Sequence, residues 1–192
     1  DLVVADFYRV NGKRYVEKKH IKKTHVMTRE EFAMEMAEDP ADFYYGVMWN
    51  KLYRKSILLE HQIQCDTSMN WCEDFVLNLQ MIRHAERFRA LQKPIYYYMK
   101  RKGSLVSTEA VSTEAVKVKF ELLEKYRDLY QSIGLYEEHK LKINSYILAV
   151  AKDGAAGVMT PKSKKLSPEN VIPDKEKPGY QHVEHTFEPV YD

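Results

Sequence analysis

The stretch EDFVLNLQMIRHAER, from Glu73 to Arg87, carries the clearest structural signal in this 192-residue sequence. Its apolar residues recur at spacings of three and four, which is the period of a helix with one face in a core; they are Phe75, Leu79, Ile82 and Ala85. Acidic residues open the stretch and basic residues close it, and both charges complement the helix dipole. We therefore predict a helix over residues 73–87 that packs on a hydrophobic core.

Toward the N-terminus, the sequence predicts a hairpin and a capped helix. Asn11-Gly12 tolerates the positive φ angles of a tight turn, and β-forming segments flank it at residues 2–10 and 14–21. Thr28 and Glu31 have the spacing of a capping box, in which each side chain accepts a hydrogen bond from the backbone N–H of the other. We therefore expect a helix over residues 29–38.

The segments that adjoin the 73–87 helix are less regular. Residues 43–59 are aromatic at first and then helical in pattern. Beyond the helix, residues 88–91 and 95–99 are expected to form two separate strands, because Lys93-Pro94 interrupts the β-forming run.

The C-terminal part is predicted to be helical and then irregular. Apolar spacing predicts helices over residues 112–133 and 137–152, with Gly134 as the stop between them. The residues expected to be buried in the first of these helices are Val118, Leu122, Leu129 and Ile133. Five of the seven prolines follow Gly154, where the apolar period disappears.

These elements predict an α/β protein, a mixed α+β fragment with an N-terminal β-hairpin and C-terminal helices. We divide the chain into a first domain at residues 1–106, a helical extension at residues 107–153 and an irregular tail at residues 154–192.

The composition excludes several classes of function. Thirty basic against 28 acidic residues leave a net charge of only +2, so no strong field attracts nucleic acid. Two cysteines are too few for a disulfide framework, and they lack the companions of a zinc site. No apolar run approaches the roughly 20 residues of a membrane-spanning helix. We therefore expect a reduced, cytoplasmic setting, no nucleic-acid partner and no membrane span.

Motifs for binding a nucleotide or a metal are absent from the sequence. Neither of the common glycine-rich phosphate loops occurs, and there is no Asp-x-Asp pair. Such closely spaced carboxylates commonly hold a divalent ion, which neutralises the charge that grows on a departing diphosphate. The sequence therefore predicts no metal or cofactor site in this chain.

Three other segments are distinctive in their order and spacing: WNKLYRKSIL at residues 49–58, WCEDF at residues 71–75 and IYYYMKRKGSL at residues 95–105. Together they resemble the C-terminal, acceptor side of bacterial family 2 glycosyltransferases. The resemblance covers roughly residues 1–106 and lies in the joint spacing, since each segment alone is a weak signal. The family's nucleotide-binding half has no counterpart before Asp1. The resemblance therefore implies an incomplete chain that is inactive alone, whereas a full-length enzyme is expected to use Mg²⁺ or Mn²⁺.

The resemblance also assigns roles to residues. Asp74 would be the general base, removing a proton from an acceptor hydroxyl while that oxygen attacks the anomeric carbon with inversion. The residues that would bind substrate are Glu73, Trp71, Trp49, Lys51, Arg101 and Ser104. Independently of the family, flanking aromatic residues can desolvate Asp74 and raise its basicity, although the helix dipole opposes this. Successive side chains diverge by about 100° on a helix, so Glu73 and Asp74 do not form the facing acid pair of a glycosidase.

Each of these residues also has a purely structural interpretation. Glu73 and Asp74 are favourable charges on a first helical turn, Trp49 and Tyr96 to Tyr98 can be packing residues, and Arg101 can be surface charge. Lys51 would then lie on a solvated helix face with Arg54 and Lys55. Two histidines in the tail, His182 and His185, are read as a solvated pair rather than a metal site.

Two function hypotheses follow. In the first, the chain takes part in sugar transfer from a nucleotide sugar to a glycan or a lipid-linked acceptor, in the cytoplasm or at the inner face of the membrane. In the second, it is a non-catalytic module that binds protein or carbohydrate. Both hypotheses are compatible with a homo-oligomer.

Overall fold

The computed structural model describes residues 1–11, 14–39, 42–66, 72–99 and 113–152. Within these ranges the chain forms a mixed sheet and two layers of helices, in the order β1-β2-α1-α2-β3-α3-α4-β4-α6-α7. The predicted α/β class, with an N-terminal hairpin and C-terminal helices, is confirmed.

Strand β1 (Leu2–Asn11) is the centre of the sheet. β2 (Arg14–Lys18) pairs antiparallel with its second half, which confirms the hairpin, and β3 (Lys51–Tyr53) pairs antiparallel with its first three residues. β4 (Phe88–Met99) runs parallel to β1 along most of its length, so it occupies the opposite edge of that strand. Because β1 has neighbours on both edges and helices above it, its residues from 4 to 7 are all buried.

β4 is one strand, and the prediction of two strands separated by Lys93-Pro94 is wrong. Its register against β1 shifts at this point, where Ala5 pairs with Leu91 but Asp6 pairs with Pro94. Proline lacks the N–H that a regular ladder needs, and a bulge in an edge strand is a place where that loss is tolerated. The proline therefore bends the strand without ending it.

Two helices lie directly on the sheet: α1 (Arg29–Glu38) and α4 (Glu73–His84). The capping box of α1 is confirmed, since Glu31 N donates to Thr28 Oγ1 at 3.2 Å and Thr28 N donates to Glu31 Oε2 at 3.0 Å. α4 ends at His84, three residues before the predicted end, because Ala85 already has the extended conformation that leads into β4. The predicted inner face of α4 is buried as expected.

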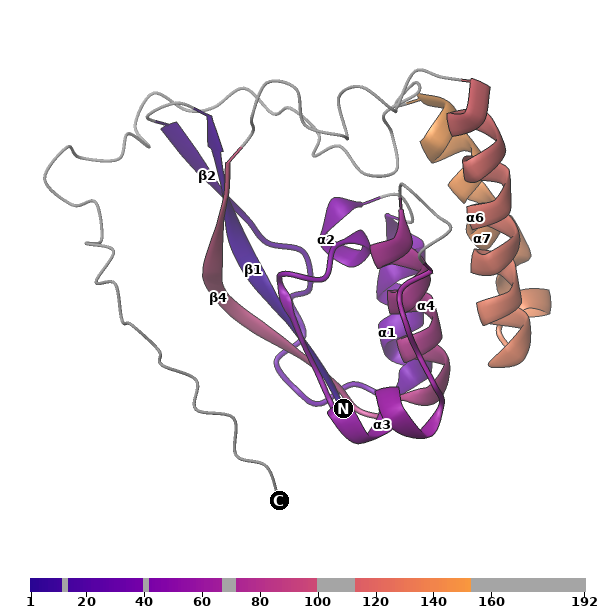
Figure 1. Cartoon of the computed structure of the whole chain (residues 1–192), viewed down its shortest axis with the longest axis horizontal. Coiled ribbons are helices and arrows are strands. Elements are labelled where there is room, and N and C mark those ends of the chain that lie inside the picture. The colour runs from indigo at the N-terminus through magenta and orange to yellow at the C-terminus, as the bar shows by residue number, and fades with distance from the viewer. Residues whose placement is uncertain (12–13, 40–41, 67–71, 100–112, 153–192) are drawn as a thin grey trace, which may run out of the picture.

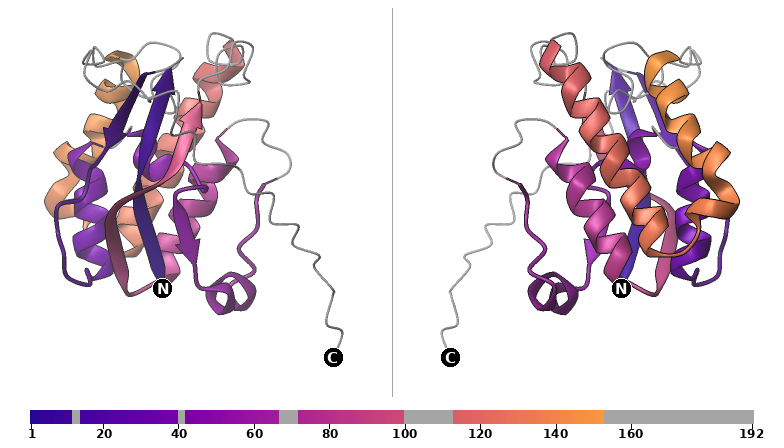
Figure 2. Two further views of the ribbon diagram at one scale, coloured as in Figure 1. Left: turned by 90° about the vertical axis from the view of Figure 1, so that its left-hand side faces the viewer. Right: turned by 90° about the vertical axis from the view of Figure 1, so that its right-hand side faces the viewer.

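The outer layer consists of α6 (Thr113–Ser132) and α7 (Tyr136–Lys152), which pack against α4 and α1 on the side away from the sheet (Figures 1 and 2). Both helices and the stop at Gly134, whose φ is +74°, were predicted. Leu122 and Leu129 are fully buried, whereas Val118 and Ile133 are half-buried. α4 is thus covered on two sides, by the sheet and by the outer layer.

The region predicted as aromatic and then helical contains three short elements. They are α2 (Phe43–Gly46), β3 and α3 (Lys55–Glu60). The loop of residues 47–50 lies between α2 and β3. Its backbone bonds to the side chains of Asp74, Lys51 and Asn78, and Asn50 O accepts from the backbone N–H of Ala5. This loop carries the residues that face Asp74.

No helix in the described ranges is both long and apolar enough to cross a membrane. The predicted tail at residues 154–192 lies outside the described residues.

Candidate functional site

Asp74 lies in the first turn of α4, where the chain turns sharply into the helix. Cys72, two residues before Asp74, has a positive φ of 68°. This left-handed backbone conformation costs residues other than glycine about 1 kcal/mol or more, so packing must stabilise the turn. Cys72 is 2% exposed, which provides that packing. The turn fixes where the Asp74 carboxylate points.

The Asp74 carboxylate is half-buried and accepts a hydrogen bond at Oδ2 from the backbone N–H of Met48, 3.2 Å away. Burial is the largest influence on its pKa and raises it above the usual value. The Met48 hydrogen bond and the Lys51 ammonium lower the pKa, while neighbouring Glu73 raises it. A carboxylate with a raised pKa and a single fixed backbone donor is suited to accept a proton.

Trp49 follows Met48 directly, but its ring packs against the sheet. Its ring stacks on Tyr96 at a centroid distance of 4.3 Å and on Tyr98 at 5.6 Å. Its edge contact with Phe7, at 4.8 Å, ties it to β1. Trp49 is half-buried and Tyr96 is 41% exposed, so this group both packs the sheet and presents aromatic surface to solvent.

Lys51 is 8% exposed, and the interpretation that it lies on a solvated helix face is wrong. Its ammonium donates to Tyr44 O at 2.9 Å, to Asn50 Oδ1 at 2.9 Å and to Val47 O. An ammonium has three N–H groups, so all are used. Burial lowers the pKa of Lys51 to about 7. The structure therefore places Lys51 under the loop, where it binds backbone atoms of this chain.

Asn78 was not predicted as a site residue. It lies one helical turn after Asp74, is fully buried, and donates from Nδ2 to Tyr45 O and Gly46 O, each at 2.9 Å. Its Oδ1 accepts from Tyr53 Oη at 2.6 Å. The signal in the sequence was a lone amide in the apolar run of α4, which the helical period alone does not distinguish from a surface position.

The predicted site residues therefore fall into two groups. The structure places Glu73 and Lys51 near Asp74, with Glu73 half-buried beside it, whereas the Trp49 ring packs against Phe7, Tyr96 and Tyr98. Trp71, Arg101 and Ser104 lie outside the described residues.

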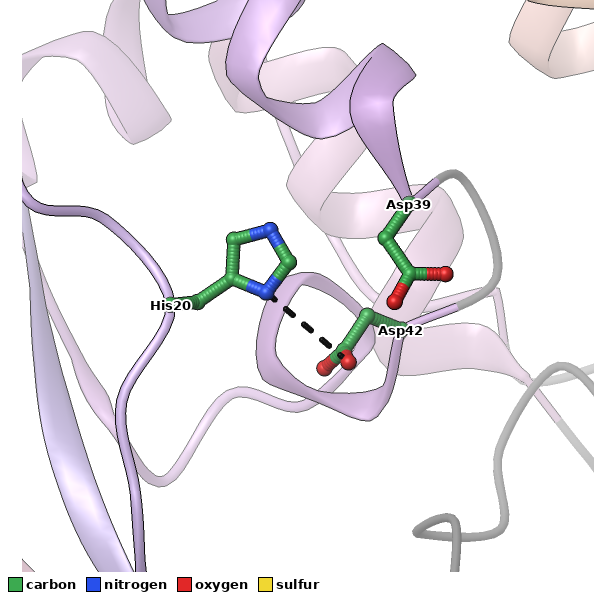
Figure 3. Close-up of side chains that lie close together, drawn as sticks. All are labelled: His20, Asp39 and Asp42. Atoms are coloured by element: carbon green, nitrogen blue, oxygen red, sulfur yellow. Dashed lines mark ion pairs between the residues drawn. The ribbon is translucent and has the colours of Figure 1, made fainter.

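A second cluster, of His20, Asp39 and Asp42, lies where α1 ends and α2 begins (Figure 3). Their ligand atoms are within 4.8 Å of one another, and His20 Nδ1 is 3.8 Å from Asp42 Oδ2. Nitrogen and carboxylate oxygen suit a divalent ion. However, Asp42 Oδ1 already accepts from Tyr44 N at 2.7 Å as the cap of α2, and the His20 ring stacks on Tyr44 at 5.6 Å. These contacts attach α2 to the chain segment that carries His20.

The chain is similar to known proteins in sequence and in fold. No protein-family model matches the chain. It is 26% identical over 107 residues to EpsJ of Bacillus subtilis (strain 168), described as an uncharacterised glycosyltransferase. The aligned residues make up 55% of this chain and 31% of EpsJ. Its fold is similar to that of S. aureus TarS 1–349, crystallised in complex with UDP-GlcNAc, with a TM-score of 0.51 and 24% identity. That match covers 78% of this chain and 40% of the TarS chain.

These matches confirm the resemblance to part of a glycosyltransferase that the three sequence segments indicated. The chain is glycosyltransferase-like in sequence and in fold, and it spans less than half the length of both proteins that it matches.

Proposed function

We propose that this chain provides the acceptor side of an inverting glycosyltransferase of family 2, with Asp74 as the general base. The observation that carries the proposal is the half-buried Asp74 carboxylate at the start of α4, with a raised pKa and one oxygen held by the Met48 N–H. Perturbed carboxylates of this kind are concentrated at functional sites.

The proposed chemistry is a single displacement. Asp74 accepts the proton of an acceptor hydroxyl while that oxygen forms a bond to the anomeric carbon of the donor sugar. The bond from that carbon to the diphosphate oxygen breaks, and the diphosphate leaves with the electron pair. General-base assistance of this type contributes about 10²–10⁴-fold to the rate.

The acceptor is proposed to be a glycan or a lipid-linked saccharide, in polysaccharide biosynthesis at the cell envelope. The flat face of Trp49 and the adjacent Tyr96 could contact a sugar ring, since aromatic rings combine apolar surface with a polar edge. Transfer would take place in the cytoplasm or at the inner face of the membrane. Contacts of Trp71, Arg101 and Ser104 with the substrate remain predictions.

Among the described residues, the cluster of His20, Asp39 and Asp42 offers three ligand atoms for the Mg²⁺ or Mn²⁺ expected for a complete enzyme, but its contacts also hold α2 in place. The sequence has no Asp-x-Asp pair. In the His20 cluster, Asp42 uses Oδ1 to cap α2. We therefore assign the binding of the donor diphosphate and its metal to sequence beyond this chain.

Two measurements test this proposal. Calorimetry of this chain with nucleotide diphosphate sugars, UDP-GlcNAc included, should show no binding, because the donor half is absent; clear affinity would contradict this part of the proposal. In the gene product that carries this chain, Asp74→Asn should lower sugar transfer by about 10²–10⁴-fold. Glu86→Gln, at the exposed position after α4, is the control for lost charge. Wild-type activity in Asp74→Asn overturns the assignment of the base.

A second candidate is a non-catalytic carbohydrate-binding module. The partly exposed stack of Trp49 on Tyr96 favours it, because such surfaces bind sugar rings without chemistry. It predicts that Tyr96→Ala weakens glycan binding while Asp74→Asn leaves the biological role intact.

A further inference from the structure

We propose that Lys51 and Asn78 are positioning residues that hold the backbone carbonyls of residues 44–47, and so present the Met48 N–H to Asp74. We call these two side chains with their carbonyl partners the carbonyl clamp. The inference rests on the proposed function in one respect, that Asp74 is the base whose surroundings matter.

Lys51 forms one side of the carbonyl clamp. Its ammonium is bonded to Tyr44 O and Val47 O, at the two ends of this stretch of chain, and to Asn50 Oδ1. Asn50 in turn donates from Nδ2 to Tyr44 O at 3.1 Å and to Ala5 O of the central strand at 3.2 Å. The loop is therefore fixed to β1 as well as to its own lysine.

Asn78 forms the other side. Asp74 and Asn78 are four residues apart, which places them on the same face of α4. Along that face the loop makes contacts of opposite polarity: Asn78 donates to Tyr45 O and Gly46 O, and Asp74 accepts from Met48 N. The loop can thus approach Asp74 with an N–H group only because its preceding carbonyls are satisfied one turn further along.

A purely electrostatic role for Lys51 is the main alternative. Its charge lowers the pKa of Asp74, so removing the lysine would raise that pKa even without any movement of the loop. Asn78 separates the two explanations because it is neutral. The titratable groups around Asp74 that must be followed in parallel are Glu73 and Cys72 on its own segment, Lys51 and Tyr53 on β3, and Cys65 after α3.

The test is an NMR titration of this chain that follows the ¹³C signal of the Asp74 carboxyl and the amide proton of Met48. In the wild type, the Met48 amide shift should titrate together with Asp74, and Asp74→Asn should abolish that titration. In Asn78→Leu, which is similar in size but cannot donate, the pKa of Asp74 should rise although no charge has changed. Hydrogen exchange of the Met48 amide should become at least about tenfold faster.

Tyr53→Phe provides a second neutral variant, in case Asn78→Leu does not fold. It removes the 2.6 Å hydrogen bond that orients the Asn78 amide and should raise the pKa of Asp74 by less than Asn78→Leu does. Tyr136→Phe on α7 is the matched control, because the Tyr136 hydroxyl is also bonded to an asparagine, Asn144, at 3.3 Å. The proposal is overturned if the neutral variants fold and the pKa of Asp74 in them equals the wild-type value.

Failure of this inference and failure of the proposed function give different results. The titration reports on the loop and on Asp74 whether or not the chain takes part in sugar transfer. If the pKa moves as expected but Asp74→Asn has wild-type transfer activity, the carbonyl clamp exists and the proposed function is wrong. If sugar transfer needs Asp74 but the neutral variants leave its pKa and its pH–rate profile unchanged, the clamp is wrong and the function stands.

Discussion

Asp6 is a buried carboxylate on the central strand without a visible partner. It is 1% exposed, and neither of its oxygens has a hydrogen bond from any described residue. Burial raises its pKa to about 6, and the nearby Glu17 adds to the shift, while Lys19 opposes it. The folded protein therefore binds the proton of the Asp6 carboxyl group more tightly than the unfolded chain does, in which the pKa is near 3.8. The contribution of Asp6 to stability is full below pH 4 and is lost as the pH rises through 6.

Asp6→Asn should remove this pH dependence. The free energy of unfolding of the variant, minus that of the wild type, should increase between pH 4 and pH 7 by up to about 3 kcal/mol, because two pKa units correspond to about that energy. Urea unfolding at several pH values, followed by circular dichroism, measures the difference. Asp128→Asn, at an exposed position of α6, controls for the change in net charge. A difference that stays constant with pH would show that folding does not raise the pKa of Asp6.

At the scale of residues, the sequence indicated Asp74 as the candidate base, but it did not indicate the side chains that hold the loop beside it. Asp74 and Trp49 were found because the resemblance rests on their segments. The burial of Lys51 was not predictable from periodicity, since its acceptors are backbone carbonyls whose positions depend on the fold. Asn78 was missed for the same reason, because its carbonyl partners lie more than 30 positions away in the chain.

The two C-terminal helices share one hydrophobic core with the sheet-covering helices. Tyr130 on α6 donates from its hydroxyl to Ala33 O of α1 at 2.6 Å. Tyr126 and Tyr146 stack at 5.0 Å between α6 and α7, and Phe75 of α4 lies against both rings. We infer that α6 and α7 unfold together with the rest of the domain.

Leu129→Ala tests this at the scale of the helix. Leu129 is fully buried, so the substitution should lower the free energy of unfolding by about 2–5 kcal/mol and keep a single transition. The matched control is Leu141→Ala on α7, where the side chain is 88% exposed and the change should stay within about 0.5 kcal/mol. A separate early transition for the helices, with the sheet unaffected, would show that they form an independent unit.

Elements with local signals were predictable, and elements defined by distant contacts were not. α1, α4, α6 and α7 carry caps, apolar periods or a glycine stop within their own residues. The continuity of β4 through Pro94 depends on its pairing with β1, more than 80 positions earlier. The placement of α2 and of the loop after it likewise depends on Asn50, Lys51 and Asn78.

At the scale of the whole molecule, the outer strand of the sheet exposes large apolar side chains. Those of β4 are between 41% and 54% exposed: Leu91, Ile95, Tyr96, Tyr97 and Met99. Among the described strands, only β1 pairs along β4. On its other edge, Phe88 forms a bridge with Met27, and no described strand pairs with the rest of that edge. Apolar edge strands of this kind promote association.

We expect the chain to self-associate through β4, and a double substitution of Ile95→Lys and Met99→Lys to reduce this. Sedimentation velocity over a tenfold range of concentration should show a shift toward larger species for the wild type and a smaller shift for the variant. Leu59→Lys with Leu141→Lys introduces the same charge at other exposed positions and should leave the wild-type behaviour unchanged. Equal association in both double variants would exclude β4 as the contact.

The group that meets Asp74 belongs to the main chain of residue 48, and this has an evolutionary consequence. Any amino acid except proline offers an N–H there, so the hydrogen bond to Asp74 does not depend on the side chain, although Met48 also packs against the core. Selection would act instead on positions 51 and 78, where an amine and an amide are needed. Divergent sequences could therefore keep the same arrangement around the carboxylate with a different apolar side chain at position 48.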